Sequence, residues 1–441
     1  MSNWLYLDNF RGFQNTLIPL TNVNFLVGEN STGKTSVLSL ISLLGSPQFW
    51  FSQNFNSDVV NLGRFRDIAS AHSGTRGRFR VGYIVPDSAS DENRSQYSQY
   101  YEAVLMTFEE VDNNPLICQY DYIGWQGEAR IEFNGKGIRY QFRHVEKESL
   151  LPEFVMGVFQ RWISALTEDK DFKQLQRQDS FNRRMALMFV DQLIQQIHDE
   201  SAIEYDKHQF SIRMPRFTHN MTWLAPIRSK PKRTYDEYKL DFTPEGEHTP
   251  YLIRRLLKSK GSTEFREFIE RFGLESGLFE KLEIKGFGKE VASPFELRVV
   301  LSNLHIALVN VGYGVSQALP VVVEMFARPE GSKFAIQQPE VHLHPRAQAA
   351  LGDVIFRLVV SEKKQFYVET HSDYLIDRFR LNYRSINGDS CPDSQILFFS
   401  RNRDGNKVTP IPIEKNGEYS EDQPSDFREF FVREQMRILG L

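Results

Sequence analysis

The sequence predicts a mixed α/β fold with a mixed sheet core, an antiparallel β subdomain and a helical insertion, and three observations support this. A glycine-rich segment at residues 28–35 follows a short apolar strand and precedes an apolar helix. Residues 76–143 are rich in aromatic and β-branched residues, as strands are. From about residue 295, strand-like and helix-like segments alternate again, as expected of a parallel α/β sheet.

These patterns divide the chain into three segments. Residues 1–148 form an N-terminal half with the glycine-rich loop and the β subdomain. Residues 149–220 form the helical insertion, because apolar residues such as those at 185–194 recur at helical spacing. Residues 221–441 form a C-terminal half with a C-terminal extension.

Bulk properties exclude several classes of protein. The net charge of −4 over 441 residues excludes a generally basic nucleic-acid coat and allows only a local basic groove. The two cysteines, Cys118 and Cys391, have no C-x-x-C spacing, which excludes a disulfide scaffold and a thiolate zinc site. No apolar run approaches the roughly 20 residues that span a bilayer. We therefore expect a cytoplasmic protein with no membrane partner.

The segment GENSTGKT at residues 28–35 matches the pattern G-x-x-x-x-G-K-T of a phosphate-binding loop. Its glycines let backbone N–H groups point at phosphate oxygens, and the following helix directs its positive end to the same charge. Lys34 is expected to reach the β- and γ-phosphates, and the Thr35 hydroxyl to ligate Mg²⁺. The sequence thus predicts ATP and Mg²⁺ as cofactors. The predicted nucleotide-binding residues of the loop are Asn30, Ser31, Thr32, Gly33, Lys34, Thr35 and Ser36.

A second strand should bring a magnesium-organising acid and a catalytic carboxylate beside the γ-phosphate. The apolar strand at residues 334–336 is the candidate, and it is followed by Gln337, Gln338, Pro339 and Glu340. A glutamine supplies neither negative charge nor a proton acceptor at pH 7. Glu340 is the nearest carboxylate and becomes the candidate for polarising the attacking water.

Four segments in order resemble the motifs of ABC-type ATPases in the RecF, SMC and OLD group. They are NFLVGEN at 24–30, GYGVSQ at 312–317, IQQPEVHLHP at 336–345 and ETHS at 369–372. The segment WLAPIR at 223–228 also resembles a bacterial subfamily of these ATPases. The resemblance covers roughly residues 1–70 and 220–441, and it implies a phosphate-loop NTPase fold of the ABC-ATPase type.

The resemblance also implies roles for single residues. Gln337 takes the position of the metal-organising acid and Gln338 that of the catalytic acid, while His371 takes that of the switch histidine that approaches the γ-phosphate. The signature segment of such enzymes contacts the nucleotide of the opposite subunit, so a homodimer with two sandwiched ATP molecules is implied. The signature residues expected to contact that nucleotide are Gly314, Ser316 and Gln317.

Three explanations of the two glutamines stay open. The chain is a natural variant that uses Glu340, or a slow or inactive ATPase, or a form in which acids were replaced by glutamine so that ATP is trapped. A zinc site at His342 and His344 is less favoured, because no third ligand lies at a convincing spacing.

Three hypotheses about biological function follow. The chain resembles the stand-alone ATPases of bacterial anti-phage systems, such as AriA of PARIS and PtuA of Septu, which implies a separate effector protein encoded nearby. It is also similar to RecF-like DNA-repair or chromosome-maintenance ATPases. The third hypothesis is a scaffold protein that ATP locks in a dimer and that hydrolyses little ATP. The basic residues that could contact DNA are Arg76, Arg78, Arg80, Lys230, Lys232 and Arg233.

Overall fold

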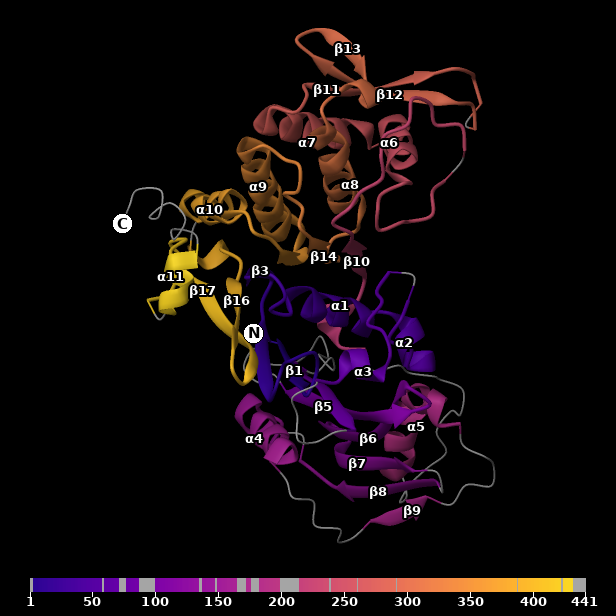
Figure 1. Cartoon of the computed structure of the whole chain (residues 1–441), viewed down its shortest axis with the longest axis vertical. Coiled ribbons are helices and arrows are strands. Elements are labelled where there is room, and N and C mark those ends of the chain that lie inside the picture. Colours follow the sequence, from indigo (N-terminus) through magenta and orange to yellow (C-terminus); the bar gives the residue numbers. More distant parts are fainter. Residues whose placement is uncertain are drawn as a thin grey trace. The chain divides into compact units, whose positions relative to one another are not determined.

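The structure is a computed structural model of the chain (Figure 1). It divides into two compact units, each built from segments that are distant in sequence. The first unit comprises Met1–Thr21, Asn30–His219 and Phe399–Val408, and the second comprises Asn22–Glu29, Asn220–Phe398 and Thr409–Leu441. The structure describes residues 3–57, 59–70, 77–86, 100–134, 137–146, 149–164, 172–175, 182–198, 214–237, 239–259, 261–290, 292–386, 388–421 and 423–430.

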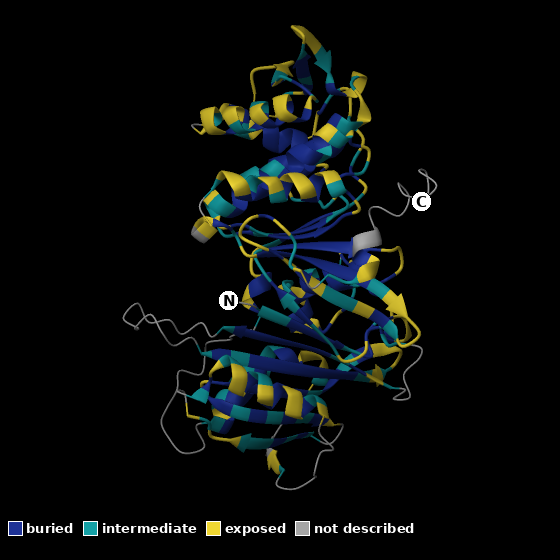
Figure 2. Cartoon of the chain, turned by 90° about the vertical axis from the view of Figure 1, so that its left-hand side faces the viewer, coloured by how far each residue is buried: buried dark blue, intermediate teal, exposed yellow. Residues whose placement is uncertain are grey.

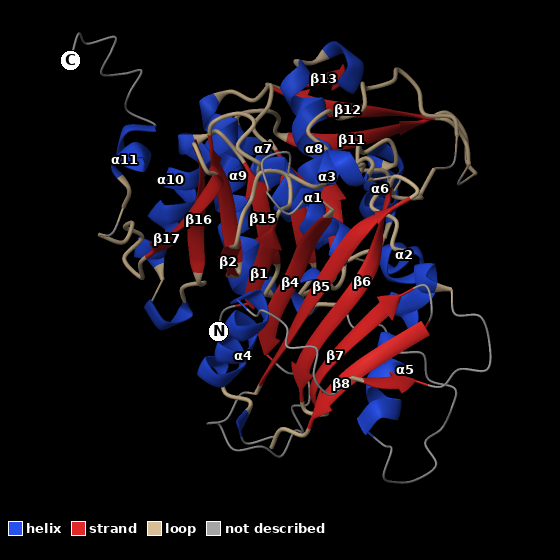
Figure 3. Cartoon of the chain, turned by 60° about the horizontal axis from the view of Figure 1, so that its bottom comes forward, coloured by secondary structure: helices blue, strands red, loops and turns tan. Residues whose placement is uncertain are grey.

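The first unit is built on an eight-stranded sheet of order β2-β1-β4-β5-β6-β7-β8-β9, whose neighbours pair antiparallel. Its long strands lie side by side in Figure 3. Asp112 and Asn113 both have positive φ, at 50° and 64°, so a tight two-residue turn joins two of these strands. The strands are β1 (Asn3–Asp8), β2 (Thr16–Leu20), β4 (Arg78–Pro86), β5 (Tyr101–Val111), β6 (Asn114–Gly124), β7 (Gly127–Asn134), β8 (Gly137–Arg143) and β9 (Lys173–Leu175).

The helices of the first unit bury their apolar side chains within that unit. Helix α4 buries Phe159 against Tyr6 of β1, with ring centroids 5.3 Å apart. The helices are α1 (Lys34–Leu44), α2 (Pro47–Ser52), α3 (Phe65–Ile68), α4 (Pro152–Ser164) and α5 (Ala186–His198), with 3-10 turns η2 (Arg183–Met185) and η3 (Arg216–Thr218). Both α4 and α5 fall within the predicted helical insertion, of which residues 165–171, 176–181 and 199–213 lie outside the described residues.

The second unit is built on a six-stranded sheet of order β10-β14-β15-β3-β16-β17. The first four of these strands run parallel to one another. All six residues of β3 are buried, as expected of a strand covered on both faces. The strands are β3 (Val23–Gly28), β10 (Met221–Leu224), β14 (Lys333–Gln337), β15 (Gln365–Glu369), β16 (Ser394–Asn402) and β17 (Gly405–Ile413).

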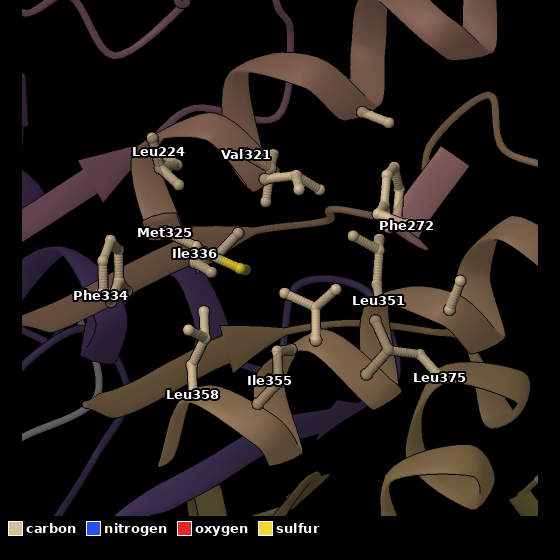
Figure 4. Packing of buried hydrophobic residues seen from close by; sticks show 14 of the residues in the cluster. Leu224, Phe272, Val321, Met325, Phe334, Ile336, Leu351, Ile355, Leu358 and Leu375 are labelled. Carbon is tan, nitrogen blue, oxygen red and sulfur yellow. The ribbon is translucent and has the colours of Figure 1, made fainter. Parts of the chain in front are cut away.

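Helices pack on this sheet through a large apolar core. Figure 4 shows residues of this core from both layers: Val321 and Met325 of α8, Ile355 and Leu358 of α9, and Phe334 and Ile336 of the strand at residues 333–337. Figure 2 shows that helices are buried on one side and exposed on the other. The helices are α6 (Thr249–Lys258), α7 (Ser262–Ser276), α8 (Tyr313–Ala327), α9 (Pro345–Glu362), α10 (Asp373–Leu381) and α11 (Ser425–Phe430), with 3-10 turns η4 (Leu308–Asn310), η5 (Asn382–Ser385) and η6 (Gly388–Ser390).

A small antiparallel sheet, β11 (Lys281–Gly286), β12 (Phe295–Leu301) and β13 (Leu304–Ala307), completes the second unit. The predicted mixed α/β fold with an antiparallel β subdomain is therefore confirmed. The predicted division of the chain into segments 1–148, 149–220 and 221–441 stays a prediction.

Candidate functional site

The phosphate loop runs from the end of β3 into the start of α1. Gly33 is the residue before the helix and has φ of 96°, a left-handed backbone that favours glycine. A Cβ atom placed there would lie 2.5 Å from the ring of Phe13 and 3.0 Å from the Asn406 side chain. The helix start has no side-chain cap. The backbone geometry is that of a glycine-dependent anion site at a helix N-terminus.

Charged and polar groups surround the start of α1. Lys34 is buried, Thr35 is exposed and Ser36 is half-buried. Arg11 lies beside them: its Nη1 donates to the Ser36 hydroxyl at 3.4 Å and its Nη2 to the Leu62 carbonyl at 2.7 Å, while its Nε has no partner. Burial lowers the pKa of Arg11 from its ordinary value. A group of cations at an uncapped helix start fits a polyphosphate.

In the second unit, the carboxyl ends of three parallel strands meet at one edge of the sheet. The Thr370 N–H donates to the Leu26 carbonyl at 3.2 Å, so the chain leaving β15 lies beside β3 just before the phosphate loop. The Gln338 N–H donates to the Glu369 carbonyl at 2.8 Å, which holds the chain leaving β14 beside β15. Ligands of open α/β sheets bind at such edges. Gln337, Gln338, Glu340 and His371 are thus gathered at the edge from which the loop departs.

Glu340 is a buried carboxylate with one unpartnered oxygen. The residue is 9% exposed, its Oε1 accepts the His371 N–H at 2.7 Å, and its Oε2 has no hydrogen-bond partner. Burial raises the pKa of Glu340, and the His371 N–H is the first of several groups that oppose this. A carboxylate with a raised pKa and a spare oxygen has the properties of a general base.

We expect Glu340→Gln to stabilise the protein at neutral pH. Because the folded-state pKa of Glu340 is raised, stability present at low pH is lost as the pH rises from the ordinary glutamate range, about pH 4, through the folded-state value. Glutamine does not titrate, so the difference in Tm between variant and parent should be small at pH 4 and grow toward pH 7. Thermal unfolding at several pH values measures this, with the exposed Glu330→Gln as the control. A variant that is less stable than the parent at pH 7 would contradict the expectation.

Arg228 is a site residue to which the sequence analysis assigned no role. It follows β10, is 2% exposed, and donates from Nη2 to the Gln337 carbonyl at 3.2 Å and from Nη1 to the Gln338 carbonyl at 3.4 Å. Its Nε has no partner. Burial lowers the pKa of Arg228 to about 10, and the charge of Glu340 opposes that shift. The guanidinium is therefore protonated at pH 7, holds the turn after β14 and stabilises an ionised Glu340.

We expect Arg228→Met to move the acidic limb of the ATP-hydrolysis pH profile upward. The lost positive charge would raise the pKa of Glu340 further. Arg228→Lys keeps the charge and should leave the limb near its original pH even if the rate falls. Initial rates of phosphate release between pH 5 and 9, measured at saturating ATP, give the pH at which the acidic limb of the profile falls. The expectation fails if both variants show the parental limb.

The signature segment packs against the turn that follows Glu340. The rings of Tyr313 and His342 are 5.1 Å apart, and a Cβ atom on Gly314 would lie 3.1 Å from the His342 carbonyl oxygen. Gly312 and Tyr313 are exposed, whereas Ser316 is buried and its hydroxyl donates to the Tyr313 carbonyl at 2.7 Å. Gln317 is also buried, and its Nε2 has no partner. The predicted contacts of Gly314, Ser316 and Gln317 with a nucleotide stay a prediction.

Residues 1–376 match the family of AAA ATPase domains. The chain belongs to this AAA ATPase family. The solved structures similar to this ATPase include an SMC head bound to the C-winged helix domain of ScpA, with 12% identity, a TM-score of 0.43 and coverage of 94% of this chain and 98% of that chain. An SMC head domain from Thermotoga maritima has 11% identity and a TM-score of 0.39, covering 93% of this chain and 98% of that one. An SMC head domain from Pyrococcus furiosus, bound to the C-terminal domain of ScpA, has 12% identity and a TM-score of 0.35, covering 99% of both chains.

No curated protein matches the AAA ATPase in sequence. Its fold is mixed α/β, as the sequence predicted. Within the described ranges, no helix of the ATPase is long and apolar enough to cross a membrane.

The donor set of the ATPase fits a nucleotide that brings its own Mg²⁺. Thr35 of the first unit and Gln337 of the second, the two residues predicted to approach Mg²⁺, each carry a neutral side-chain oxygen. Mg²⁺ in nucleotide sites is held partly by the phosphates themselves. No group of three or more His, Cys, Asp or Glu residues that could hold a metal occurs in the part of the chain that the structure describes. A site built here would therefore depend on the phosphate oxygens for negative charge.

Two of the basic residues proposed to contact DNA are used in ion pairs of the first unit of the ATPase. Arg80 pairs with Asp8 at 2.7 Å, and Arg78 lies 3.5 Å from Glu109. Arg76 lies outside the described residues. Lys230, Lys232 and Arg233 are exposed in the second unit. A DNA contact, if made, would rest mainly on this second group.

Proposed function

We propose that the chain binds ATP with Mg²⁺ at residues 28–36 and hydrolyses it with Glu340 as the base, and that nucleotide binding joins two subunits. The observation that carries this proposal is the unpartnered Oε2 of buried Glu340, at the sheet edge from which the phosphate loop departs. The bound nucleotide would supply the γ-phosphoryl group, with Mg²⁺ offsetting its charge. Glu340 would accept the proton of the attacking water, and Arg228 would keep Glu340 ionised.

The neutral side chains of Gln337 and Gln338 support slow turnover. An amide orients a water molecule by hydrogen bonding but takes no proton. Gln338 has φ of 44°, and its carbonyl accepts from Arg228, so the turn is fixed by its backbone. We propose that Gln337 and Gln338 position water and Mg²⁺ while Glu340 performs the proton transfer. His371, which is exposed next to Glu340, would contact the γ-phosphate through its ring.

An exposed apolar surface beside the signature segment supports subunit assembly. Tyr313, the first residue of α8, is 40% exposed, and Val309, in the 3-10 turn η4 just before it, is 37% exposed. Exposed apolar groups near a functional segment are typical of protein–protein contacts. The proposed partner surface is the nucleotide-bound phosphate loop of a second copy, as in ATP-sandwiched dimers.

Light scattering with and without nucleotide tests the assembly. Glu340→Gln protein with ATP and Mg²⁺ is expected to shift from one to two copies, and Tyr313→Asp introduced into it should abolish that shift. Phe287→Asp is the matched control, because Phe287 is 52% exposed and directly follows β11, outside the signature segment. A strict monomer at saturating ATP would refute the assembly, and assembly unchanged by Tyr313→Asp would refute this surface.

We further propose that the assembled ATPase works in the cytoplasm and controls a separate effector protein in a bacterial anti-phage system. The support is the likeness of its motifs to such stand-alone ATPases. Purification of the tagged chain with the proteins encoded beside it, followed by mass spectrometry, tests this proposal. Recovery of an ATP-dependent partner with nuclease or toxin chemistry is expected. Recovery of no neighbour-encoded protein, with and without ATP, would reject it.

Two alternatives have observations of their own. Exposed Lys230, Lys232 and Arg233 favour a DNA-maintenance ATPase, which would show salt-dependent binding to duplex DNA. The neutral Gln337 and Gln338 favour a nucleotide-locked scaffold, which would dimerise with ATP and release negligible phosphate.

A further inference from the structure

The second unit contains a pocket of about 280 Å³ whose lining includes no residue of the phosphate loop. The loop around residues 229–239, the N-terminal end of α6 and the first half of α8 form its walls. Its lining includes Lys230, Lys232, Lys239, Thr249, Tyr251 and Ser316. Its volume is close to the lower end of the range of small-molecule sites, about 300 Å³.

The charge of the pocket is positive. Three lysines line it, against a single carboxylate, Glu247. Lys239 donates to Glu247 at 3.1 Å and lies 3.4 Å from Glu237, so its charge is largely balanced. Lys230 and Lys232 are exposed and have no ion pair with any residue that the structure describes. The positive end of α6 adds to the same field, so the pocket favours an anion.

A buried hydroxyl in the wall lacks a partner. Thr249, the first residue of α6, is 2% exposed, and its Oγ1 has no hydrogen bond. A buried polar group without a partner is unfavourable, so such groups often mark a ligand. Gly246 packs closely here, since a Cβ atom on it would lie 2.5 Å from Pro320 and 3.0 Å from the Thr249 hydroxyl.

The interior of the pocket is apolar and aromatic. Tyr251 and Tyr235 contact each other at 5.9 Å, and Tyr235 stacks on Phe295 at 5.4 Å, which fixes both tyrosine rings. The Tyr235 hydroxyl accepts the Lys232 N–H at 3.1 Å and so attaches the basic loop to the aromatic wall. The remaining apolar lining includes Ile253, Leu297, Leu308 and Leu319. Such a site takes a molecule with an anionic end and an apolar or aromatic body.

We propose that this pocket binds a small phosphomonoester of the nucleoside monophosphate class, at a site separate from the phosphate loop. Lys230 and Lys232 hold the phosphate, the Thr249 hydroxyl donates to a ligand oxygen, and the tyrosine wall contacts the base. Pro320 has no N–H, so the Ser316 carbonyl lacks its usual helical partner and can accept a hydrogen bond from the ligand. The ligand therefore contacts α8, the helix that begins in the signature segment.

Calorimetric titration of AMP into Lys34→Ala protein tests this site, because that variant removes the lysine of the phosphate loop. One AMP per chain is expected. Adenosine should bind at least ten-fold more weakly, and inorganic phosphate should compete with AMP. Combining Lys230→Gln and Lys232→Gln should weaken AMP binding at least ten-fold, whereas Lys281→Gln with Lys289→Gln removes the same charge elsewhere and should leave it unchanged.

Thr249→Val separates binding from folding. It removes the unpartnered hydroxyl, so the Tm should not fall, while AMP binding should weaken several-fold. The proposal is overturned if Lys34→Ala protein binds no AMP, or binds it equally well with and without Lys230 and Lys232. The proposal is also overturned if the protein binds no AMP but binds duplex DNA in a way that requires Lys230 and Lys232. That result would assign the loop to a nucleic-acid contact. Failure here leaves ATP binding at residues 28–36 unaffected, because that site is measured in the parent protein.

Discussion

Lys34→Ala is expected to weaken ATP binding about 100-fold, equivalent to roughly 3 kcal/mol. The reason is the position of Lys34 as the first residue of α1, buried behind a glycine whose backbone is left-handed. A charged hydrogen bond to a phosphate is worth about 1.5–3 kcal/mol, and no other lysine lies in the loop to replace it. Equilibrium titration with a fluorescent ATP analogue measures the loss.

Two controls accompany that variant. Lys281→Ala removes the same charge from an exposed strand position and should bind ATP as the parent does. Near-UV circular dichroism should show that Lys34→Ala keeps its tertiary packing, because the change removes a side chain without adding volume. If the folded Lys34→Ala protein binds ATP within about three-fold of the parent, the phosphate loop is not the ATP site; such a difference is below 1 kcal/mol.

Glu340→Gln is expected to lower ATP hydrolysis at least 100-fold while ATP binding changes little. General-base catalysis contributes about 10²–10⁴-fold, and glutamine cannot accept the proton. The shape of the site changes little, because the amide oxygen can still accept the His371 N–H that now binds Oε1. Phosphate release at saturating ATP, together with the affinity for ATP, separates the two effects. Equal rates in parent and variant would remove Glu340 from the mechanism.

Gln338→Glu distinguishes the three explanations of the glutamines. If Glu340 is the natural base, the added carboxylate should change the rate only slightly. If an acid was replaced at this position, Gln338→Glu should raise hydrolysis about 100-fold or more and make it insensitive to Glu340→Gln. If neither variant nor parent releases phosphate above background, the chain is a scaffold. Glu330→Gln, an exposed change in the same unit, is the control for Glu340→Gln, which also loses one negative charge.

The motif-bearing parts of the fold could be predicted because their signals are local. The glycine loop between β3 and α1, the strand before Gln337 and the strand before His371 are each fixed by neighbours within about ten residues. The antiparallel strands of the first unit could also be predicted, because turn residues such as Asn113 separate runs of aromatic and β-branched residues.

The roles of Arg228 and Arg11 could not be predicted from the sequence alone. Arg228 contacts the carbonyls of residues more than 100 positions later, and this depends on the parallel pairing of β10 with β14. Arg11 reaches Ser36 because a left-handed residue, with φ of 44°, turns the chain after β1. The pocket beside Thr249 likewise joins three segments. Such contacts follow from tertiary packing, which leaves no spacing pattern in the sequence.

The pairing of β3 has a consequence for the synthesis of the chain. Val23 pairs with Phe366, so the strand that carries the phosphate loop leaves the ribosome long before its neighbour β15 is made. At about 5–20 residues per second, the intervening chain takes roughly 17–70 s to translate. During that interval a strand that is apolar except for Asn24, VNFLV, has no sheet to join. The nascent chain should therefore need a chaperone until residue 369 has emerged, and truncations before that point should aggregate.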